Sequence, residues 1–319
     1  MSDLRVAEAS VDDAEVVRDV IHAAFGPRPR VDPPSTALAE TTASVAETLA
    51  GHGGLLCWVD GEPAGAVLFD DAGTALALRR VSAVPHFQSR GVASAIVGVA
   101  EEVAAGRGYD DVQLKARTEL PATLVFWLRR GYIELTRDGT NVTYGKALPV
   151  ELAASSADDT RAIGKRIAGL CRAGDVVILT GELGAGKTTL AQGLGEGLGV
   201  RGDVTSPTFV ISRMHPSLVG GPALVHVDAY RLGDEAELDD LDLDAFVDDG
   251  VTVVEWGEGM AEALSDERLR VHVARSQGDS ADELRTVTAV PVGARWFGAG
   301  VRSSLLATSG VNGLPSPIG

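Results

Sequence analysis

The sequence predicts an α/β protein of two domains, each built on a mixed sheet of parallel and antiparallel strands. Its 319 residues suffice for two ordinary domains, and 45% hydrophobic residues suffice for a core in each. The hydrophobic pattern breaks near Pro149, which divides the chain. After this break strands and helices alternate, and the last two strand candidates, 268–274 and 283–290, have the period-two pattern of an antiparallel hairpin. The second sheet is therefore expected to be mixed.

The first domain, expected at residues 1–149, shows strand and helix candidates in alternation. In chain order they are an apolar strand at 75–84, a helix of small apolar residues at 92–105, a strand at 111–115, a helix ending in Phe126-Trp-Leu-Arg-Arg-Gly-Tyr132, and a closing strand at 141–148.

The turn Gln88-Ser-Arg-Gly-Val-Ala93 lies between the first of these strands and its helix. Successive backbone amides at an open helix start can hold a pyrophosphate. Together with the surrounding elements, the turn resembles the pyrophosphate loop of the GNAT acetyltransferases, which reads Gln/Arg-x-x-Gly-x-Gly/Ala. The resemblance spans about residues 3–148, with a first helix at 11–25 and a strand–turn–strand at 55–69. It implies that acetyl-CoA is bound by Gln88, Ser89, Arg90, Gly91, Val92 and Ala93.

The catalytic residues of one GNAT branch, the ribosomal-protein N-acetyltransferases, are not matched. Lys115, Leu120 and Trp127 stand where that branch has a glutamate, an asparagine and an acid tyrosine. An indole cannot donate a proton to a leaving thiolate, and Lys115 would act as a base only if its pKa fell strongly. Transfer by that branch's chemistry is therefore not expected.

Three other residues of the first domain are possible acid or base groups: Glu101, Glu119 and Tyr132. The preferred interpretation is that they are ordinary solvated or core side chains. The first domain is accordingly expected to bind CoA. It either acetylates an unknown acceptor or is a non-catalytic scaffold.

The second domain, expected at residues 150–293, opens with a helix. Ser156 is placed to cap a helix that runs to about Cys171, and Asp159 is favourable in its first turn. The last segment, 294–319, is rich in Gly, Ser and Pro near its end and is expected to be a flexible tail.

Residues 181–188, Gly-Glu-Leu-Gly-Ala-Gly-Lys-Thr, form a complete phosphate-binding loop between a buried strand candidate, 175–180, and an amphipathic helix. The glycines let the backbone turn tightly and aim its N–H groups at phosphate oxygens. Lys187 supplies a charge for the β- and γ-phosphates, and the Thr188 hydroxyl can ligate Mg²⁺. The expected nucleotide-binding residues are Gly181, Glu182, Leu183, Gly184, Ala185, Gly186, Lys187, Thr188 and Thr189.

Two later strand candidates, 223–227 and 251–254, each end in a carboxylate, Asp228 and Glu255. Parallel sheets gather functional groups at the C-terminal ends of their strands, beside the phosphate loop. One carboxylate would serve the metal and the other the attacking water or a sensing loop. Each could also be a helix cap.

Four motifs in this order resemble the TsaE family, the bacterial ATPases of tRNA threonylcarbamoyladenosine synthesis. They are the phosphate loop extended to Leu190, Val204-Thr-Ser-Pro-Thr-Phe209, His226-Val-Asp-Ala-Tyr-Arg-Leu232 and Val254-Glu-Trp256. The similarity covers about 152–292. It implies that Lys187 and Thr188 bind the phosphates and Mg²⁺, that Glu255 serves the metal, and that Asp228 supports hydrolysis. It also implies that Ser206, Pro207 and Thr208 form a switch-like loop and that Trp256 lies beside the site.

The resemblance also implies an activity and partners. The ATPase would hydrolyse Mg-ATP slowly alone and act with TsaB and TsaD in the modification of adenosine-37 of tRNA. Two rival classes carry similar loops. A small-molecule kinase usually adds a basic lid, and no Arg-rich insertion follows residue 190; a regulatory GTPase commonly has an Asn-Lys-x-Asp segment, and no lysine follows Lys187.

The net charge of −17 is shared by both domains. Such a surface repels phosphate backbones, so tRNA is expected to be reached only through partners. The segment 234–249 holds nine carboxylates and no basic group, and is either a solvated helix or a docking face for a protein partner. No apolar run has the length of a membrane span, and the N-terminus lacks the apolar segment of a signal peptide. The two cysteines, Cys57 and Cys171, do not have the spacing of a metal site or a redox motif. A cytoplasmic location is expected.

Overall fold

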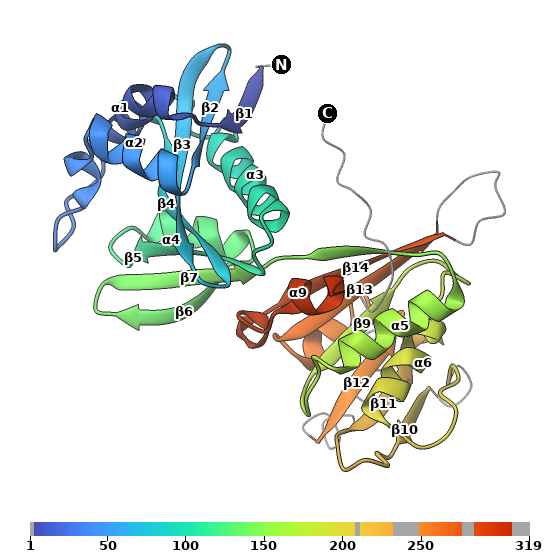
Figure 1. Ribbon diagram of the computed structural model, residues 1–319. Coiled ribbons are helices and arrows are strands. Elements are labelled where there is room, and N and C mark those ends of the chain that lie inside the picture. The colour runs from blue at the N-terminus through green and yellow to red at the C-terminus, as the bar shows by residue number, and fades with distance from the viewer. Residues whose placement is uncertain (1–2, 208–210, 232–248, 276–283, 308–319) are drawn as a thin grey trace. The chain divides into compact units, whose positions relative to one another are not determined.

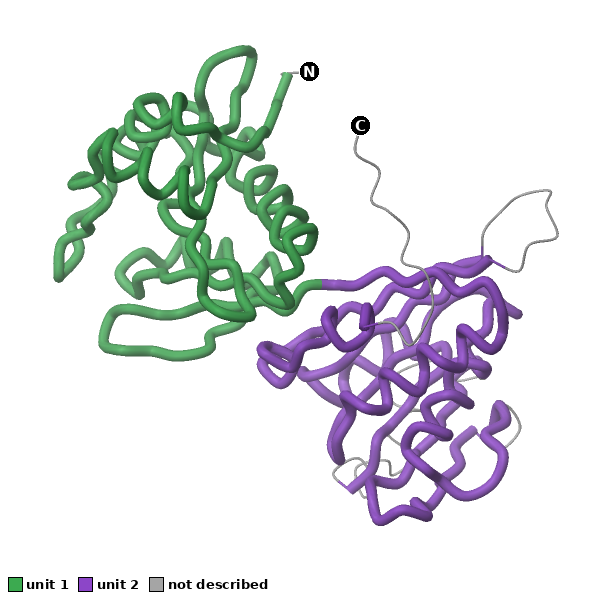
Figure 2. Tube along the Cα trace, in the orientation of Figure 1, with its two compact units in different colours: residues 1–148 green, residues 149–319 purple. Residues whose placement is uncertain are grey.

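The chain divides into two compact units, residues 1–148 and 149–319, each of which is described by itself (Figure 2). The structure is a computed structural model that describes residues 3–207, 211–231, 249–275 and 284–307. Both units are mixed α/β, which confirms the predicted fold class. Within the described ranges, none of the helices combines the length and apolar character of a membrane crossing.

Unit 1 is built on a seven-stranded sheet in the order β1-β2-β3-β4-β5-β7-β6, in which only the β4–β5 pair is parallel (Figure 1). Its elements are β1 (Leu4–Glu8), α1 (Ala14–Phe25), α2 (Thr42–Gly51), β2 (Gly54–Val59), β3 (Glu62–Ala72), β4 (Ala75–Ala83), α3 (Val92–Gly106), β5 (Asp111–Arg117), α4 (Pro121–Arg129), β6 (Ile133–Asp138) and β7 (Asn141–Ala147).

Burial explains why these segments form regular elements. In α1 the buried residues Val17, Val20, Ile21 and Ala24 recur at helical spacing, so one face of the helix packs on the core. The parallel pair is short: β4 and β5 pair only from Ala75 to Leu78 of β4, although β4 continues to Ala83. The far ends of the two strands therefore diverge near the turn that begins α3.

Unit 2 contains a second seven-stranded sheet, in the order β10-β11-β12-β9-β13-β14-β8. The central strands β11, β12, β9 and β13 are parallel, and β10, β14 and β8 run antiparallel to their neighbours. Its elements are β8 (Val150–Ala154), α5 (Ala157–Ala168), β9 (Val176–Thr180), α6 (Lys187–Leu198), β10 (Ser212–His215), β11 (Ala223–Asp228), β12 (Gly250–Glu255), β13 (Arg268–Arg275), β14 (Arg285–Val292) and α9 (Val301–Leu306). The predicted β13–β14 hairpin is confirmed.

The packing of unit 2 follows from local sequence. All five residues of β9 are buried, as in a parallel strand covered on both faces. The Ser156 side chain accepts a hydrogen bond from the Asp159 backbone N–H, so the predicted cap of α5 is present. Helices α5 and α6 pack closely (Figure 1), and Gly193 permits this because it has no side chain. A Cβ at this position would lie 2.1 Å from the Arg161 carbonyl oxygen.

The segment after residue 293 differs from the expected flexible tail. A 3₁₀ turn, Ala294–Trp296, and helix α9 follow β14, and the side chains of Trp296, Val301 and Leu305 are buried. Arg295 is tied to Asp175 by two hydrogen bonds. These buried contacts hold residues 294–306 against the rest of unit 2, and residues 308–319 lie outside the described ranges.

Candidate functional site

The phosphate-binding loop joins β9 to α6 and has the backbone that its glycines permit. The φ angles are +133° at Gly181, +76° at Gly184 and +115° at Gly186. Residues other than glycine rarely adopt such positive φ angles, because their Cβ atom would clash with the backbone. Helix α6 begins at Lys187 directly after the loop, so its N-terminus and free amides lie at the loop. The loop can therefore present N–H groups to an anion.

Lys187 is buried within this loop. Its ammonium donates to the carbonyl oxygens of Gly181 and Glu182, each at 2.9 Å, and lies 3.7 Å from the centre of the Trp256 ring. Burial lowers the pKa of Lys187, and the charges of Glu255 and Asp228 partly oppose that shift. The cation is thus held by dipoles, a ring face and nearby carboxylates, which are weaker partners than a bound phosphate would be.

The carboxylate of Glu255, at the end of β12, has both oxygens engaged. Thr188 Oγ1 donates to Oε2 at 3.0 Å, and His226 Nε2 lies 2.9 Å from Oε1. Glu255 and His226 are both buried. The contact fixes the Glu255 carboxyl group against the imidazole of His226. A positioned carboxylate next to a threonine hydroxyl results.

These two groups fit a magnesium site. Mg²⁺ prefers hard oxygen ligands and commonly takes only one or two from the protein, with waters and substrate phosphates supplying the others. The Thr188 hydroxyl and the Glu255 carboxylate are such ligands and lie within 3.0 Å of each other. In the described part of the chain there is no group of three or more His, Cys, Asp or Glu side chains that could hold a metal by itself. The two protein oxygens would thus leave the other metal positions to waters or to a bound ligand.

Asp228, at the end of β11, lies beside Glu255 in the parallel register. Its carboxylate accepts a hydrogen bond of 2.6 Å from Ser206 Oγ and one of 3.1 Å from the Tyr230 backbone N–H. Trp256 has a φ of +62°, and its ring lies 5.3 Å from that of Tyr230. This left-handed turn after β12 brings the ring of Trp256 over Lys187.

The structure thus brings together most of the residues that the sequence singled out in unit 2: Lys187, Thr188, Ser206, Asp228, Glu255 and Trp256. Pro207 is buried, and its carbonyl oxygen accepts from the Ile211 N–H at 2.7 Å. Thr208 and the acidic stretch up to residue 248 lie outside the described residues, so the switch role of Thr208 and the docking role of that stretch stay predictions.

Sequence reasoning gave no role to two residues of this site. His226 contacts Glu255, and its position two residues before Asp228 on one strand face was a usable signal. Arg285, at the start of β14, donates from Nε to the Ala185 carbonyl oxygen at 2.9 Å. No local pattern predicts that contact, because the two residues are 100 positions apart.

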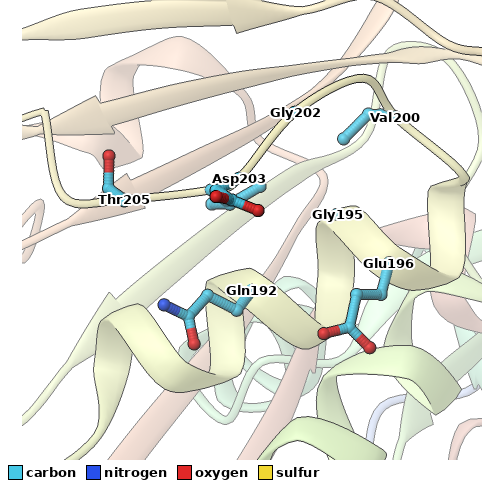
Figure 3. A pocket seen from close by; sticks show the side chains of 8 residues that line it. Gln192, Gly195, Glu196, Val200, Gly202, Asp203 and Thr205 are labelled. Carbon is cyan, nitrogen blue, oxygen red and sulfur yellow. The ribbon is translucent and has the colours of Figure 1, made fainter.

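A separate pocket lies beside the second half of α6 (Figure 3). Its volume is about 390 Å³, and it is lined by Gln192, Gly195, Glu196, Val200, Gly202, Asp203, Val204 and Thr205. None of these is among the predicted site residues, although Val204 and Thr205 open the motif that contains Ser206, and the Glu196 carboxylate is already paired with the Lys165 ammonium at 2.6 Å. The pocket is therefore distinct from the phosphate loop.

In unit 1 the turn before α3 has the geometry of an anion cradle. Ser89 has a φ of +66° and Gly91 one of +83°, and Gly91 caps the helix that starts at Val92. The N–H groups of Gln88 and Arg90 donate within the turn to the carbonyl oxygens of Pro85 and Phe87, so an anion would be held by the open N-terminus of α3. Arg90 donates to the Asp60 carboxylate at 3.0 Å, which ties the turn to the β2–β3 hairpin. Gln88 precedes this cradle, and Ala93 lies in the first turn of α3.

The possible acid and base groups of unit 1 are engaged with other side chains. Hydrogen bonds from Arg117 lower the pKa of Glu119. Burial raises the pKa of Tyr132, whose hydroxyl donates to Glu101 at 3.1 Å, and Lys146 pairs with the same carboxylate at 2.7 Å. These contacts support the interpretation of these groups as structural.

Three residues stand where the ribosomal-protein N-acetyltransferases have their catalytic groups, and none of the three replaces such a group chemically. Lys115 is exposed on β5, Leu120 precedes α4, and Trp127 is buried against Tyr132 with ring centres 4.9 Å apart. Trp127 is thus a core residue.

Comparison with known proteins assigns a family relationship to each unit. Residues 154–284 match the family described as threonylcarbamoyl adenosine biosynthesis protein TsaE, and residues 19–132 match the acetyltransferase (GNAT) family. The TsaE protein of Streptomyces coelicolor is 63% identical over 142 residues, which are 44% of this chain and 96% of that protein. The TsaE protein of Bacillus subtilis is 42% identical over 140 residues, 44% of this chain and 84% of that protein.

Two solved structures each match slightly less than half of the chain. Bacillus subtilis YdiB is 34% identical, with a TM-score of 0.39, and the match covers 47% of this chain and 90% of that one. The PaiA N-acetyltransferase of Thermoplasma acidophilum, solved in complex with coenzyme A, is 13% identical, with a TM-score of 0.41, and the match covers 46% of this chain and 99% of that one.

Proposed function

Because the chain belongs to the TsaE family and carries a GNAT-family domain in front of it, we propose that unit 2 is a Mg-ATP-dependent ATPase of tRNA threonylcarbamoyladenosine biosynthesis. The relatives that support this proposal are named for that pathway. TsaB and TsaD are the proposed partners, and the acidic chain reaches position 37 of the tRNA through them, in the cytoplasm.

The convergence on Glu255 is the observation that carries the proposal. Thr188 at the helix start, His226 on β11 and Glu255 on β12 meet beside the buried ammonium of Lys187. Thr188 and Glu255 would hold Mg²⁺, and the phosphate-loop amides and Lys187 would hold the phosphates. A bound Mg²⁺ would stabilise the charge that develops on the transferred phosphoryl group. Asp228, held by Ser206, would orient the attacking water.

For unit 1 we propose binding of acetyl-CoA at the turn from Gln88 to Ala93. The support is the open N-terminus of α3, which follows the left-handed residues Ser89 and Gly91 next to the point where β4 and β5 diverge.

The ATPase is tested by Lys187→Ala and Glu255→Gln. The first removes the cation that stabilises the γ-phosphate, and the second removes the charge that holds Mg²⁺. Each is expected to reduce turnover by on the order of 10²–10³ in the presence of TsaB and TsaD. Phosphate release from ATP is the measurement.

Lys165→Ala and Glu258→Gln are the matched controls, because they remove the same charges from side chains that are 53% and 63% exposed in the same unit. Wild-type turnover in both site variants would disprove the assignment. Transfer of phosphate to a small molecule instead of water would support the kinase alternative, and preference for GTP would support the GTPase alternative.

A further inference from the structure

Arg285 reaches the phosphate loop from a strand outside the parallel part of the sheet. Strand β14 pairs with β13 and β8, and Arg285 is its first residue, opposite Arg275 of β13 and Ala154 of β8. Its Nε donates to the Ala185 carbonyl oxygen at 2.9 Å. The side chain also lies across the next residue, because a Cβ built on Gly186 would be 3.4 Å from Nε and 3.5 Å from Cδ of Arg285.

We propose that Arg285 is a positioning residue that fixes the second half of the phosphate loop for a nucleoside triphosphate. The proposal rests on the proposed ATPase function of that loop. Arg285 directly follows the region that matches the TsaE family, which ends at residue 284.

The planarity of the peptide bond gives the contact its effect. In a trans peptide the C=O and the following N–H point in opposite directions. Since Arg285 holds the Ala185 carbonyl, the N–H of Gly186 in the same plane points away from Arg285. Gly186 has a φ of +115°, so its peptide has conformational freedom that most residues lack. The arginine removes part of that freedom and directs one amide donor.

Two cations thus hold the loop at different carbonyls. Lys187 holds those of Gly181 and Glu182 from inside the loop, whereas Arg285 holds that of Ala185. Lys187 would exchange its carbonyls for phosphate oxygens when nucleotide binds, because an ammonium–phosphate contact is the stronger one. Arg285 has no need to move, and the Ala185–Gly186 peptide is preorganised for the anion.

Hydrogen–deuterium exchange of the full chain without nucleotide tests the clamp directly. In Arg285→Ala the amides of residues 182–188 are expected to exchange faster, while those of β9 and β12 keep the wild-type rate. Arg275→Ala is the matched control, since it removes the same charge from an exposed residue directly opposite on the hairpin. Arg285→Lys, which keeps the charge but not the planar fork, is expected to be intermediate.

Calorimetric titration with ATP and with ADP supplies the second readout. Arg285→Ala is expected to weaken both by on the order of tenfold to a hundredfold, which is the effect of losing one charge-assisted hydrogen bond, and Arg275→Ala is expected to bind as the wild type does. The inference is overturned if Arg285→Ala has the same loop exchange and the same nucleotide affinity as Arg275→Ala. It is also overturned if exchange becomes faster throughout unit 2, because Arg285 would then contribute to general stability. Failure of the wild type to bind ATP would instead refute the proposed function, and the exchange comparison would still decide the clamp.

Discussion

Removal of one partner of the buried ion pair between Arg295 and Asp175 is expected to destabilise unit 2 strongly. Arg295 donates from Nε and Nη2 to the two Asp175 oxygens at 2.9 and 2.8 Å, and from Nη2 to the Leu170 carbonyl oxygen at 2.7 Å. The Arg295 side chain is 9% exposed and that of Asp175 is 4% exposed. Arg295→Ala removes all three donors and leaves the carboxylate buried without its charge partner.

The size of the effect follows from that burial. Removal of one partner of a buried ion pair costs about 3–5 kcal/mol. In a unit of this size, 1 kcal/mol corresponds to about 2–4 °C in the melting temperature, so Arg295→Ala is expected to lower the Tm of unit 2 by about 6–20 °C. The double change Arg295→Met with Asp175→Leu removes both charges and is expected to recover much of the loss.

Thermal and urea unfolding, followed by tryptophan fluorescence and by circular dichroism, measure the loss. Arg161→Ala is the control: its partner Asp158 is 91% exposed and three residues away on α5, so the pair is expected to contribute about 0.5 kcal/mol or less. If Arg295→Ala lowers the Tm no more than Arg161→Ala does, the pair does not hold the segment after residue 293, and the reasoning from burial is wrong.

Two further predictions concern the CoA turn and the cysteines. Gly91→Glu puts a like charge beside the proposed pyrophosphate position and is expected to abolish the acetyl-CoA binding that calorimetry measures. Gly91→Ala is the control, because it also places a side chain at a φ of +83° but adds no charge. Equal losses of affinity in both variants would refute the electrostatic argument. Burial raises the pKa of Cys57 to about 11 and that of Cys171 to about 12, from 9.0. Since each folded thiol keeps its proton to higher pH than the unfolded thiol, their contribution to stability is present below about pH 9 and is lost as the pH rises towards those values. Cys57→Ala is expected to reduce that loss in urea titrations at about pH 8 and about pH 10, and an unchanged pH dependence would contradict the shift.

Some parts of this protein follow from local sequence alone. The phosphate loop, the helix after it and the Ser156 cap depend on residues within a few positions of one another, so short motifs predict them. The carboxylates Asp228 and Glu255 were found because each directly follows a run of buried strand residues, and parallel strands end at the same edge. The family relationship was visible for the same reason, since it rests on four short motifs in order.

Contacts between distant parts of the chain were decided only by the tertiary structure. The register of β11 with β12 places His226 against Glu255, and β14 places Arg285 against Ala185. The Arg285 contact leaves no periodic signal, and the sequence places His226 only on the strand face of Asp228, because the pattern records which face of a strand is buried and not which partner covers it.

The segment after residue 293 shows the same limit. Its end is rich in Gly, Ser and Pro, a composition typical of mobile tails, yet Trp296 is fully buried and Arg295 finds its charge partner 120 residues earlier. Composition alone did not predict the 3₁₀ turn Ala294–Trp296 or helix α9. Its position depended on a buried indole and one ion pair, whose stabilisation exists only once strand β9 and the Asp175 carboxylate before it are in place.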